Sequence, residues 1–162
     1  MKNNCFKPGQ VWLDTNGAPI QAHGGSVLFI NGTYYWYGEN KEKTVGDGKY
    51  WTYGIKCYSS TDLYNWQDLG FIIPPSEDEK SPLYPKNMID RPHIVYNEKT
   101  KKFVMWIKLM GDNGRDQYMV ILTADDIHGP FQILHEVRPG GFLSGDFDLI
   151  YDEEADKAYI MF

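Results

Sequence analysis

Residues 26–37 read SVLFINGTYYWY, two runs of strand-forming residues joined by Asn31-Gly32. Asn-Gly between two apolar runs favours a two-residue β-hairpin turn, because both residues tolerate the positive φ that this turn requires. The pattern recurs as PHIVYNEKTKKFVMW at 92–106 and DLIYDEEADKAYIMF at 148–162. An aromatic residue occupies the equivalent place in each hairpin: Tyr35, Phe103 and Tyr159. The sequence therefore predicts an internal repeat.

A second pair of strands follows each of the first two hairpins. YSSTDL at 58–63 comes before Trp66, and LTADDI at 122–127 comes before Phe131. No long stretch has the apolar spacing of an amphipathic helix, so we expect an all-β chain. The predicted strands are 26–30, 33–37, 53–59 and 66–72 in the first unit, 92–96, 102–108, 118–123 and 131–134 in the second, and 146–151 and 157–162 in the third.

Four-stranded units repeated in tandem are typical of a β-propeller. The predicted blades are blade I at about residues 20–75, blade II at about 90–136 and the start of blade III at about 144–162. Strand number alone leaves a β-sandwich open as the alternative. Closure needs more blades than these, and the chain ends within a predicted strand, so we expect it to be part of a longer protein. A half-propeller completed by another copy or by a second polypeptide is the other option.

Composition excludes several classes of function. The chain has 162 residues and a net charge of −6, so it has no basic patch for nucleic acid and we expect no such partner. No apolar run is long enough to span a membrane, and we expect no membrane partner. Residues 1–10 have no apolar core of an export signal. Cys5 and Cys57 form neither a disulfide framework nor a metal-ligand spacing.

No cofactor is expected either. The acidic run at 152–156 lacks the glycine and spacing of a calcium loop and falls at a predicted hairpin turn, so we expect no metal site. Phosphate-binding loops and nucleophile elbows are absent from the sequence. Aromatic residues make up 15% of the chain, which favours strands and is compatible with a sugar-facing surface.

The motifs resemble, in order, those of family 43 glycoside hydrolases, and among them the branch that contains exo-β-1,3-galactanases. The matching segments are PGQVW at 8–12, DTNG at 14–17, QAHGG at 21–25, YYWYGE at 34–39, DRPHIVYN at 90–97, FVMW at 103–106 and SGDFDL at 144–149. The resemblance implies a five-bladed β-propeller of which this chain is the N-terminal part, about two and a half blades. It also implies a secreted or periplasmic enzyme that hydrolyses β-linked galactan or related plant side chains with inversion.

Asp146 is the candidate catalytic residue. Glycosidases commonly use two carboxyl groups at the scissile bond, and a third acid nearby can keep the proton donor's pKa high. Asp146 opens the third unit and matches the family's pKa-modulating aspartate, whereas Asp148 is expected to be a neighbour of that site. The alternative is that Asp146 only caps the turn after the Pro139-Gly140-Gly141 loop.

Substrate-binding candidates lie at the equivalent ends of the first two units. Asp90 stands where the galactanase-like branch usually has a sugar-contacting glutamate, so its carboxylate is one methylene shorter. His23 falls where most family members have the general-base aspartate, and the branch shares this departure. Glu39 is expected to reach the substrate; the alternatives are a strand-initiating Asp90, a structural His23 and a solvated Glu39.

Aromatic residues supply the remaining candidates. Trp36, Tyr37 and also Trp106 could stack on a sugar ring, although the alternation of a strand requires some of these rings to pack between blades instead. An oligo- or polysaccharide is the expected partner, and self-association through exposed blade edges is a further expectation.

The family's proton-donating glutamate and the branch's base-position residue belong to blades four and five, outside this sequence. We therefore expect the chain by itself to be inactive as a glycosidase. Two other functions remain open: a non-catalytic carbohydrate-binding propeller, and an assembly protein whose half-propellers pair through edge strands.

Overall fold

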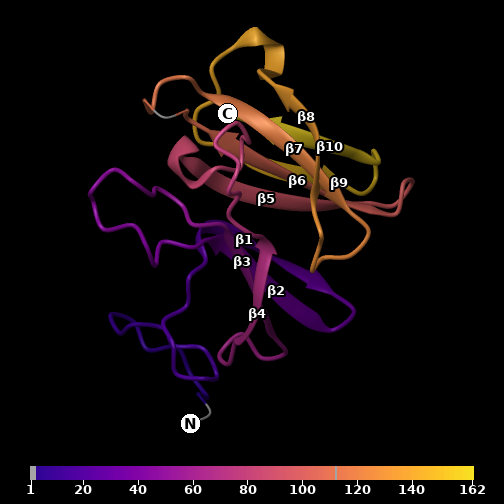
Figure 1. Ribbon diagram of the computed structural model, residues 1–162. Coiled ribbons are helices and arrows are strands. Elements are labelled where there is room, and N and C mark those ends of the chain that lie inside the picture. Colours follow the sequence, from indigo (N-terminus) through magenta and orange to yellow (C-terminus); the bar gives the residue numbers. More distant parts are fainter. Residues whose placement is uncertain (1–2, 112) are drawn as a thin grey trace.

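The computed structural model describes residues 3–111 and 113–162 (Figure 1). In this part of the chain the regular elements are β-strands and two short 3₁₀ helices, and no α-helix is present. The prediction of an all-β chain is therefore confirmed. No helix of the described residues is long and apolar enough to cross a membrane.

The strands form three antiparallel sheets in chain order. The first sheet has the order β1 (His23–Ile30), β2 (Thr33–Glu39), β3 (Ile55–Ser60) and β4 (Gln67–Ile73). After a 3₁₀ helix at Pro85–Asn87, the second sheet has the order β5 (Ile89–Asn97), β6 (Lys102–Leu109), β7 (Tyr118–Ala124) and β8 (Gln132–Val137). A second 3₁₀ helix at Pro139–Gly141 precedes the hairpin of β9 (Asp148–Asp152) and β10 (Lys157–Met161).

Every predicted strand overlaps an observed one, and the first hairpin turns where expected. Asn31 and Gly32 both have positive φ, 49° and 82°, and Ile30 pairs with Thr33 across the turn. β8 ends three residues after the predicted end at 134, and the other large differences are at the starts of β1 and β5, which lie before the predicted starts at 26 and 92. Both strands have a bulge there, at Gly24-Gly25 and Arg91-Pro92, and these residues look like strand breakers in the sequence.

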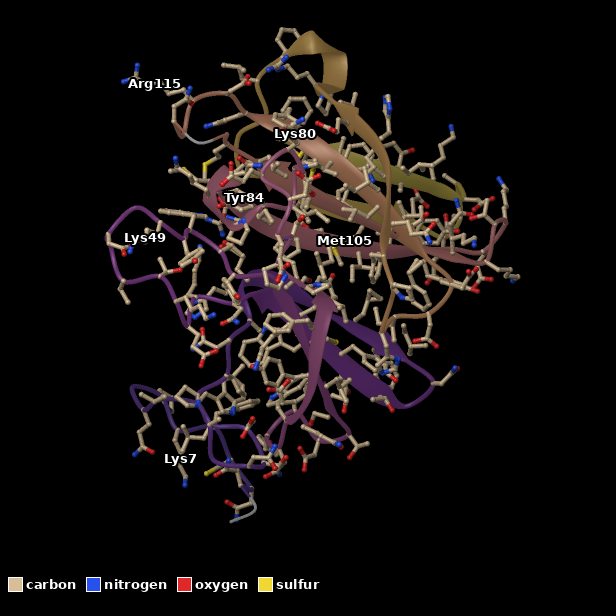
Figure 2. The ribbon with its side chains drawn as sticks, in the orientation of Figure 1. Lys7, Lys49, Lys80, Tyr84, Met105 and Arg115 are labelled. Carbon is tan, nitrogen blue, oxygen red and sulfur yellow. The ribbon has the colours of Figure 1, made fainter. Side chains whose placement is uncertain are left out.

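The core lies where the first sheet meets the second. β5 packs beside both β1 and β2, and β9 packs beside β5, so the three sheets follow one another in space as in sequence. Figure 1 shows β1–β4 below β5–β8, and Figure 2 shows Met105 between them. The buried side chains include Tyr37, Ile55, Ile94, Met105, Ile107, Leu109 and Val120. This packing fixes the strand ends at which the polar candidates lie.

Candidate functional site

The repeat brings polar residues to equivalent strand ends. His23 at the start of β1 pairs with Glu39 at the end of β2, and Asp90 in β5 pairs with Lys108 in β6 in the same antiparallel register. A bulge follows the first residue of each pair. Asp146 precedes β9, beside this part of β5 and β6. The acids that the sequence singled out, together with Lys108, thus come from all three units.

Glu39 is held in a closely fitting socket. Its side chain is 2% exposed, and its carboxylate pairs with the Lys41 ammonium and hydrogen-bonds Thr52 Oγ1 at 3.0 Å. The backbone N–H of Arg91 donates to Glu39 Oε1 at 3.2 Å. On the remaining side lies Gly24, where a Cβ would overlap Glu39 Oε1. With a φ of 57° as well, position 24 favours glycine, and any Cβ there would require the Glu39 carboxylate to shift.

Glu39 and Asp90 form a hydrogen-bonded pair of carboxyl groups. Burial, followed by the hydrogen bond to Asp90, raises the pKa of Glu39 to about 7. Burial also opposes ionisation of Asp90, but its hydrogen bond with Glu39 and the Lys108 ammonium outweigh burial and lower the pKa of Asp90. Of the two groups, Glu39 thus holds a proton more strongly than its ordinary pKa implies, and Asp90 is the acid that ionises more readily.

Lys108 links Asp90 to Asp146. Its Nζ lies 2.9 Å from Asp90 Oδ2 and 2.7 Å from Asp146 Oδ1, and its side chain is buried. Burial lowers the pKa of Lys108, but the two carboxylates outweigh burial and raise it. Lys108 is therefore a permanent cation between an acid of the second sheet and an acid that precedes the third.

Asp146 is the most accessible acid of the group, with a side chain 63% exposed. The hydrogen bond from Lys108, together with the charges of Lys108 and Arg91, lowers its pKa. Arg91 Nη2 lies 2.9 Å from Asp146 Oδ2. Asp146 is thus an ionised carboxylate facing solvent and fixed from behind by two cations. Such a group can raise the pKa of an acid placed near it, which is the role predicted for Asp146.

Arg91 acts on two acids through an unusual backbone conformation. Its φ of 54° nearly equals the 57° of Gly24, which occupies the corresponding bulge in β1. A left-handed conformation costs a non-glycine residue about 1–2 kcal/mol. The N–H bond to Glu39 and the guanidinium bond to Asp146 offset this cost.

His23 and Asp148 lie at the edges of the cluster. Burial and the Lys41 cation lower the pKa of His23, so its exposed imidazole is neutral at pH 7. Asp148, at the start of β9, has its Oδ1 3.4 Å from Nδ1 of His93, which belongs to the neighbouring strand β5. His23 can thus donate or accept a hydrogen bond at the rim of the site, and Asp148 has a partner of its own.

The structure favours the packing alternative for two of the three aromatic candidates, Tyr37 and Trp36. Tyr37 is 1% exposed, and its hydroxyl accepts a hydrogen bond from the Ile94 N–H at 2.9 Å. Trp36 packs against Trp12 and Trp66, with ring centroids at 5.1 and 5.3 Å. Neither ring is among the contacts of the acidic cluster.

Sequence reasoning missed the cations of the site and its hydroxyl: Lys41, Thr52, Lys108 and the role of Arg91. The repeat does contain the signal for Lys108, because this residue stands in the second hairpin where Glu39 stands in the first. Lys41 and Thr52 lie in the loop between β2 and β3, where no periodicity guides a prediction. Within residues 3–111 and 113–162, no group of three or more His, Cys, Asp or Glu side chains is arranged to hold a metal ion.

Four-stranded antiparallel sheets in tandem, with polar residues at equivalent strand ends, are typical of β-propeller proteins. No protein-family model and no curated protein matches the chain. Among solved structures, the chain is similar to a family 43 β-1,3-galactosidase, with a TM-score of 0.87 and 34% identity, over 98% of this chain and 33% of that one.

Two exo-β-1,3-galactanases are also similar. The enzyme from Phanerochaete chrysosporium, whose structure contains galactose, has a TM-score of 0.85 and 30% identity over 94% of this chain and 34% of its own. The enzyme from Clostridium thermocellum has a TM-score of 0.76 and 28% identity over 94% of this chain and 34% of its own. A variant of the P. chrysosporium enzyme was crystallised with β-1,3-galactotriose.

The resemblance to family 43 glycoside hydrolases of the exo-β-1,3-galactanase type is therefore confirmed. The chain spans about a third of the length of these three structures. The number of blades and their boundaries remain predictions.

Proposed function

We propose that this chain contributes the sugar-binding and pKa-setting acids of a family 43 glycoside hydrolase that removes galactose from β-1,3-linked galactan with inversion. The observation that carries the proposal is the linked set Glu39, Asp90 and Asp146, which three successive sheets bring together. The similarity of the whole chain to β-1,3-galactanases supports the substrate class. In this proposal the sheets are blades I, II and the start of III of a five-bladed propeller, at about 20–75, 90–136 and 144–162.

Each acid has a distinct task in the proposed enzyme. Asp90 accepts hydrogen bonds from the hydroxyls of the terminal galactose, with His23 at the rim, and the buried Glu39 bonds to Asp90 from behind. Asp146, held ionised by Lys108 and Arg91, raises the pKa of the proton donor. An inverting enzyme also needs that donor and a base across the sugar ring. We place both in parts of the protein outside this chain, so the chain binds sugar without cleaving it.

A carbohydrate-binding propeller without catalysis is the second candidate. Asp90 already bonds to Lys108 and Glu39, an arrangement that suits a fixed binding surface. The two functions differ in what Asp146 does: in a binding protein it only holds sugar, whereas in the enzyme its charge is required for turnover.

Sugar binding by the 162-residue chain tests the proposal. We expect galactose, titrated by ligand-observed NMR or calorimetry, to bind the wild type and to bind Asp90→Ala at least about tenfold more weakly, since each hydrogen bond to a charged group contributes about 1.5–3 kcal/mol. Asp125→Ala is the matched control, because Asp125 is an exposed aspartate that also pairs with a lysine. Absence of galactose binding by the folded wild type contradicts the proposal, and turnover by the chain alone contradicts the placement of the donor elsewhere.

A further inference from the structure

Trp51 is a partly exposed tryptophan whose backbone is held by hydrogen bonds. It lies in the loop of residues 40–54 between β2 and β3, which projects from the sheets in Figure 1 and has Lys49 at its outer part in Figure 2. The side chain of Trp51 is 40% exposed. The backbone N–H of Trp51 donates to the Pro85 carbonyl at 3.3 Å, and the backbone carbonyl of Trp51 accepts a hydrogen bond from Thr44 Oγ1 at 2.7 Å. The backbone of Trp51 is therefore tied both to its own loop and to the segment that leads into the second sheet.

Lys41 connects Trp51 to the acidic cluster. The Lys41 Nζ lies 4.3 Å from the centroid of the Trp51 ring and 2.9 Å from the Trp51 carbonyl oxygen. The same ammonium pairs with Glu39 and hydrogen-bonds Thr52 Oγ1 at 3.1 Å. One face of the indole is thus covered by a cation that also touches the carboxylate, and a cation–π contact of this kind is attractive.

The chemistry of the open face suits a sugar ring. A pyranose has hydroxyls at its rim and C–H groups on its faces, and the axial hydroxyl of galactose leaves one face with adjacent C–H groups. An aromatic ring offers an apolar plane for that face at little conformational cost, since its side chain has two rotatable bonds. Carboxyl groups beside the plane supply acceptors for the rim hydroxyls. Trp51 supplies the apolar plane, and Lys41 connects it through Glu39 to Asp90, an acid with exposed surface.

We propose that Trp51 is the stacking platform of a second sugar subsite, next to the subsite at Asp90. The proposal rests on the proposed function, and it assigns the second sugar of a β-linked galactan to this ring. Lys41 has a positioning role, because it fixes the ring and the Glu39 carboxylate relative to each other. The terminal galactose binds at the carboxyl groups, and its neighbour stacks on the indole.

Trp12 provides a matched control. It is 37% exposed, close to the exposure of Trp51, but it packs against Phe6, Trp36 and Trp66 with ring centroids at 5.6, 5.1 and 6.5 Å. Trp12 lies in the segment before β1 and has no contact with the acidic cluster in the ion pairs and hydrogen bonds of the described residues. A substitution of Trp12 removes an exposed tryptophan without touching the proposed subsite.

The experiment compares the affinities of the 162-residue chain for galactose and for β-1,3-galactobiose, measured by calorimetry or ligand-observed NMR. We expect the wild type and Trp12→Ala to bind the disaccharide about tenfold more tightly than galactose, since stacking of one ring is worth about 1–1.5 kcal/mol. Trp51→Ala should lose this preference and keep the affinity for galactose. Trp51→Leu keeps apolar bulk without a planar ring, should behave in the same way, and replaces the alanine variant if circular dichroism shows that Trp51→Ala is unfolded.

Each outcome has one meaning. A disaccharide preference that persists in folded Trp51→Ala or Trp51→Leu overturns the inference about Trp51 and leaves the proposed function intact. Equal affinities of the wild type for galactose and galactobiose also overturn the inference about Trp51 and leave the proposed function intact. Equal loss of both sugars in a folded Trp51 variant also contradicts a separate subsite. A wild type that binds neither sugar overturns the proposed function, and the inference about Trp51 with it.

Discussion

Lys108 shows how much of the site depends on a single buried charge. Its ammonium is the shared partner of Asp90 and Asp146, and Asp90 in turn bonds to Glu39. Removing one partner of a buried ion pair costs far more than the pair contributes, because the remaining charges are left without compensation. Replacing Lys108 would leave two carboxylates from neighbouring sheets facing each other.

Lys108→Met is therefore expected to lower the free energy of unfolding by about 3 kcal/mol at pH 7. The loss should shrink toward pH 4, because protonation of the unpaired acids removes their repulsion. Urea unfolding followed by circular dichroism measures both values. Lys102→Met is the control, since Lys102 pairs with Asp125 at the surface and its removal should cost less than about 1 kcal/mol. Equal losses in the two variants would contradict the role given to Lys108.

The contribution of Glu39 to stability should change with pH in the opposite direction to that of Lys108: it should decrease as the pH rises. Its pKa in the folded state, about 7, is above the ordinary value of 4.5, so the fold favours the protonated form. Its contribution to stability is complete below about pH 4.5 and is lost as the pH rises through 7. The lowered pKa of Asp90 acts below about pH 4, outside this window.

We expect the wild type to lose of the order of 1–3 kcal/mol of stability between pH 5 and pH 8 relative to Glu39→Gln, which resembles the protonated form. Chemical denaturation at several pH values measures the difference. The exposed Glu42 lies on the following loop, so Glu42→Gln should show the same pH dependence as the wild type. Parallel curves for the wild type and Glu39→Gln would show that Glu39 is ionised throughout.

The sequence predicted the acids of the site better than their partners. Asp90, Asp146 and Glu39 are recognisable because they stand at strand ends within motifs. Lys41 and Thr52 reach Glu39 from an irregular loop, and a contact of that kind depends on tertiary packing. The role of Arg91 could not be predicted either, because its left-handed backbone conformation is set by a bulge, and arginine is not a residue type that indicates such a conformation.

At the scale of elements, the bulges of β1 and β5 decide the shape of the site. They extend each strand beyond its predicted start and bring residues 24 and 91 to either side of Glu39. Hairpins, by contrast, follow local rules. Asn31-Gly32 specifies its turn by backbone conformation alone, so the strands around it lie where the pattern predicts.

Gly24→Ala should cost more than a comparable substitution in a turn. Both Gly24 and Gly32 have positive φ, at 57° and 82°, so alanine is strained at either position by about 1–2 kcal/mol. A Cβ at residue 24 also meets Glu39 Oε1, whereas one at residue 32 meets nothing within 4 Å. We expect Gly24→Ala to be less stable than Gly32→Ala by at least about 1 kcal/mol in urea unfolding. Equal stabilities would mean that Glu39 moves aside without cost.

At the scale of the whole molecule, the third sheet leaves apolar side chains open. β10 pairs only with β9 among the described strands, and Tyr159, Met161 and Phe162 are each about half exposed. An open strand edge with exposed apolar residues is a template for association with another chain. The repeat predicted the ends of this hairpin to within two residues, but only the structure shows which of its side chains remain uncovered.

We predict that the 162-residue chain self-associates at tens of micromolar. Light scattering coupled to size-exclusion chromatography should give a mass above the 18.7 kDa of the monomer. Met161→Lys should shift the chain toward the monomer, because a charge on the edge opposes pairing. Val45→Lys places the same charge on an exposed loop residue and should have no effect. A monodisperse monomer with cooperative unfolding would contradict the prediction and favour a self-contained fold.

The matched bulges also limit how the repeats can be exchanged. Gly24 and Arg91 have nearly the same backbone conformation, yet Gly24 leaves space for the Glu39 carboxylate and Arg91 donates to that carboxylate. A chimera with two copies of the first hairpin would keep the backbone N–H at position 91 but lose the guanidinium that bonds Asp146. One with two copies of the second hairpin would place a side chain at position 24, where the first has none. The backbones of the two hairpins could therefore replace each other, but the site needs a different side chain at each bulge: none at residue 24 and an arginine at residue 91.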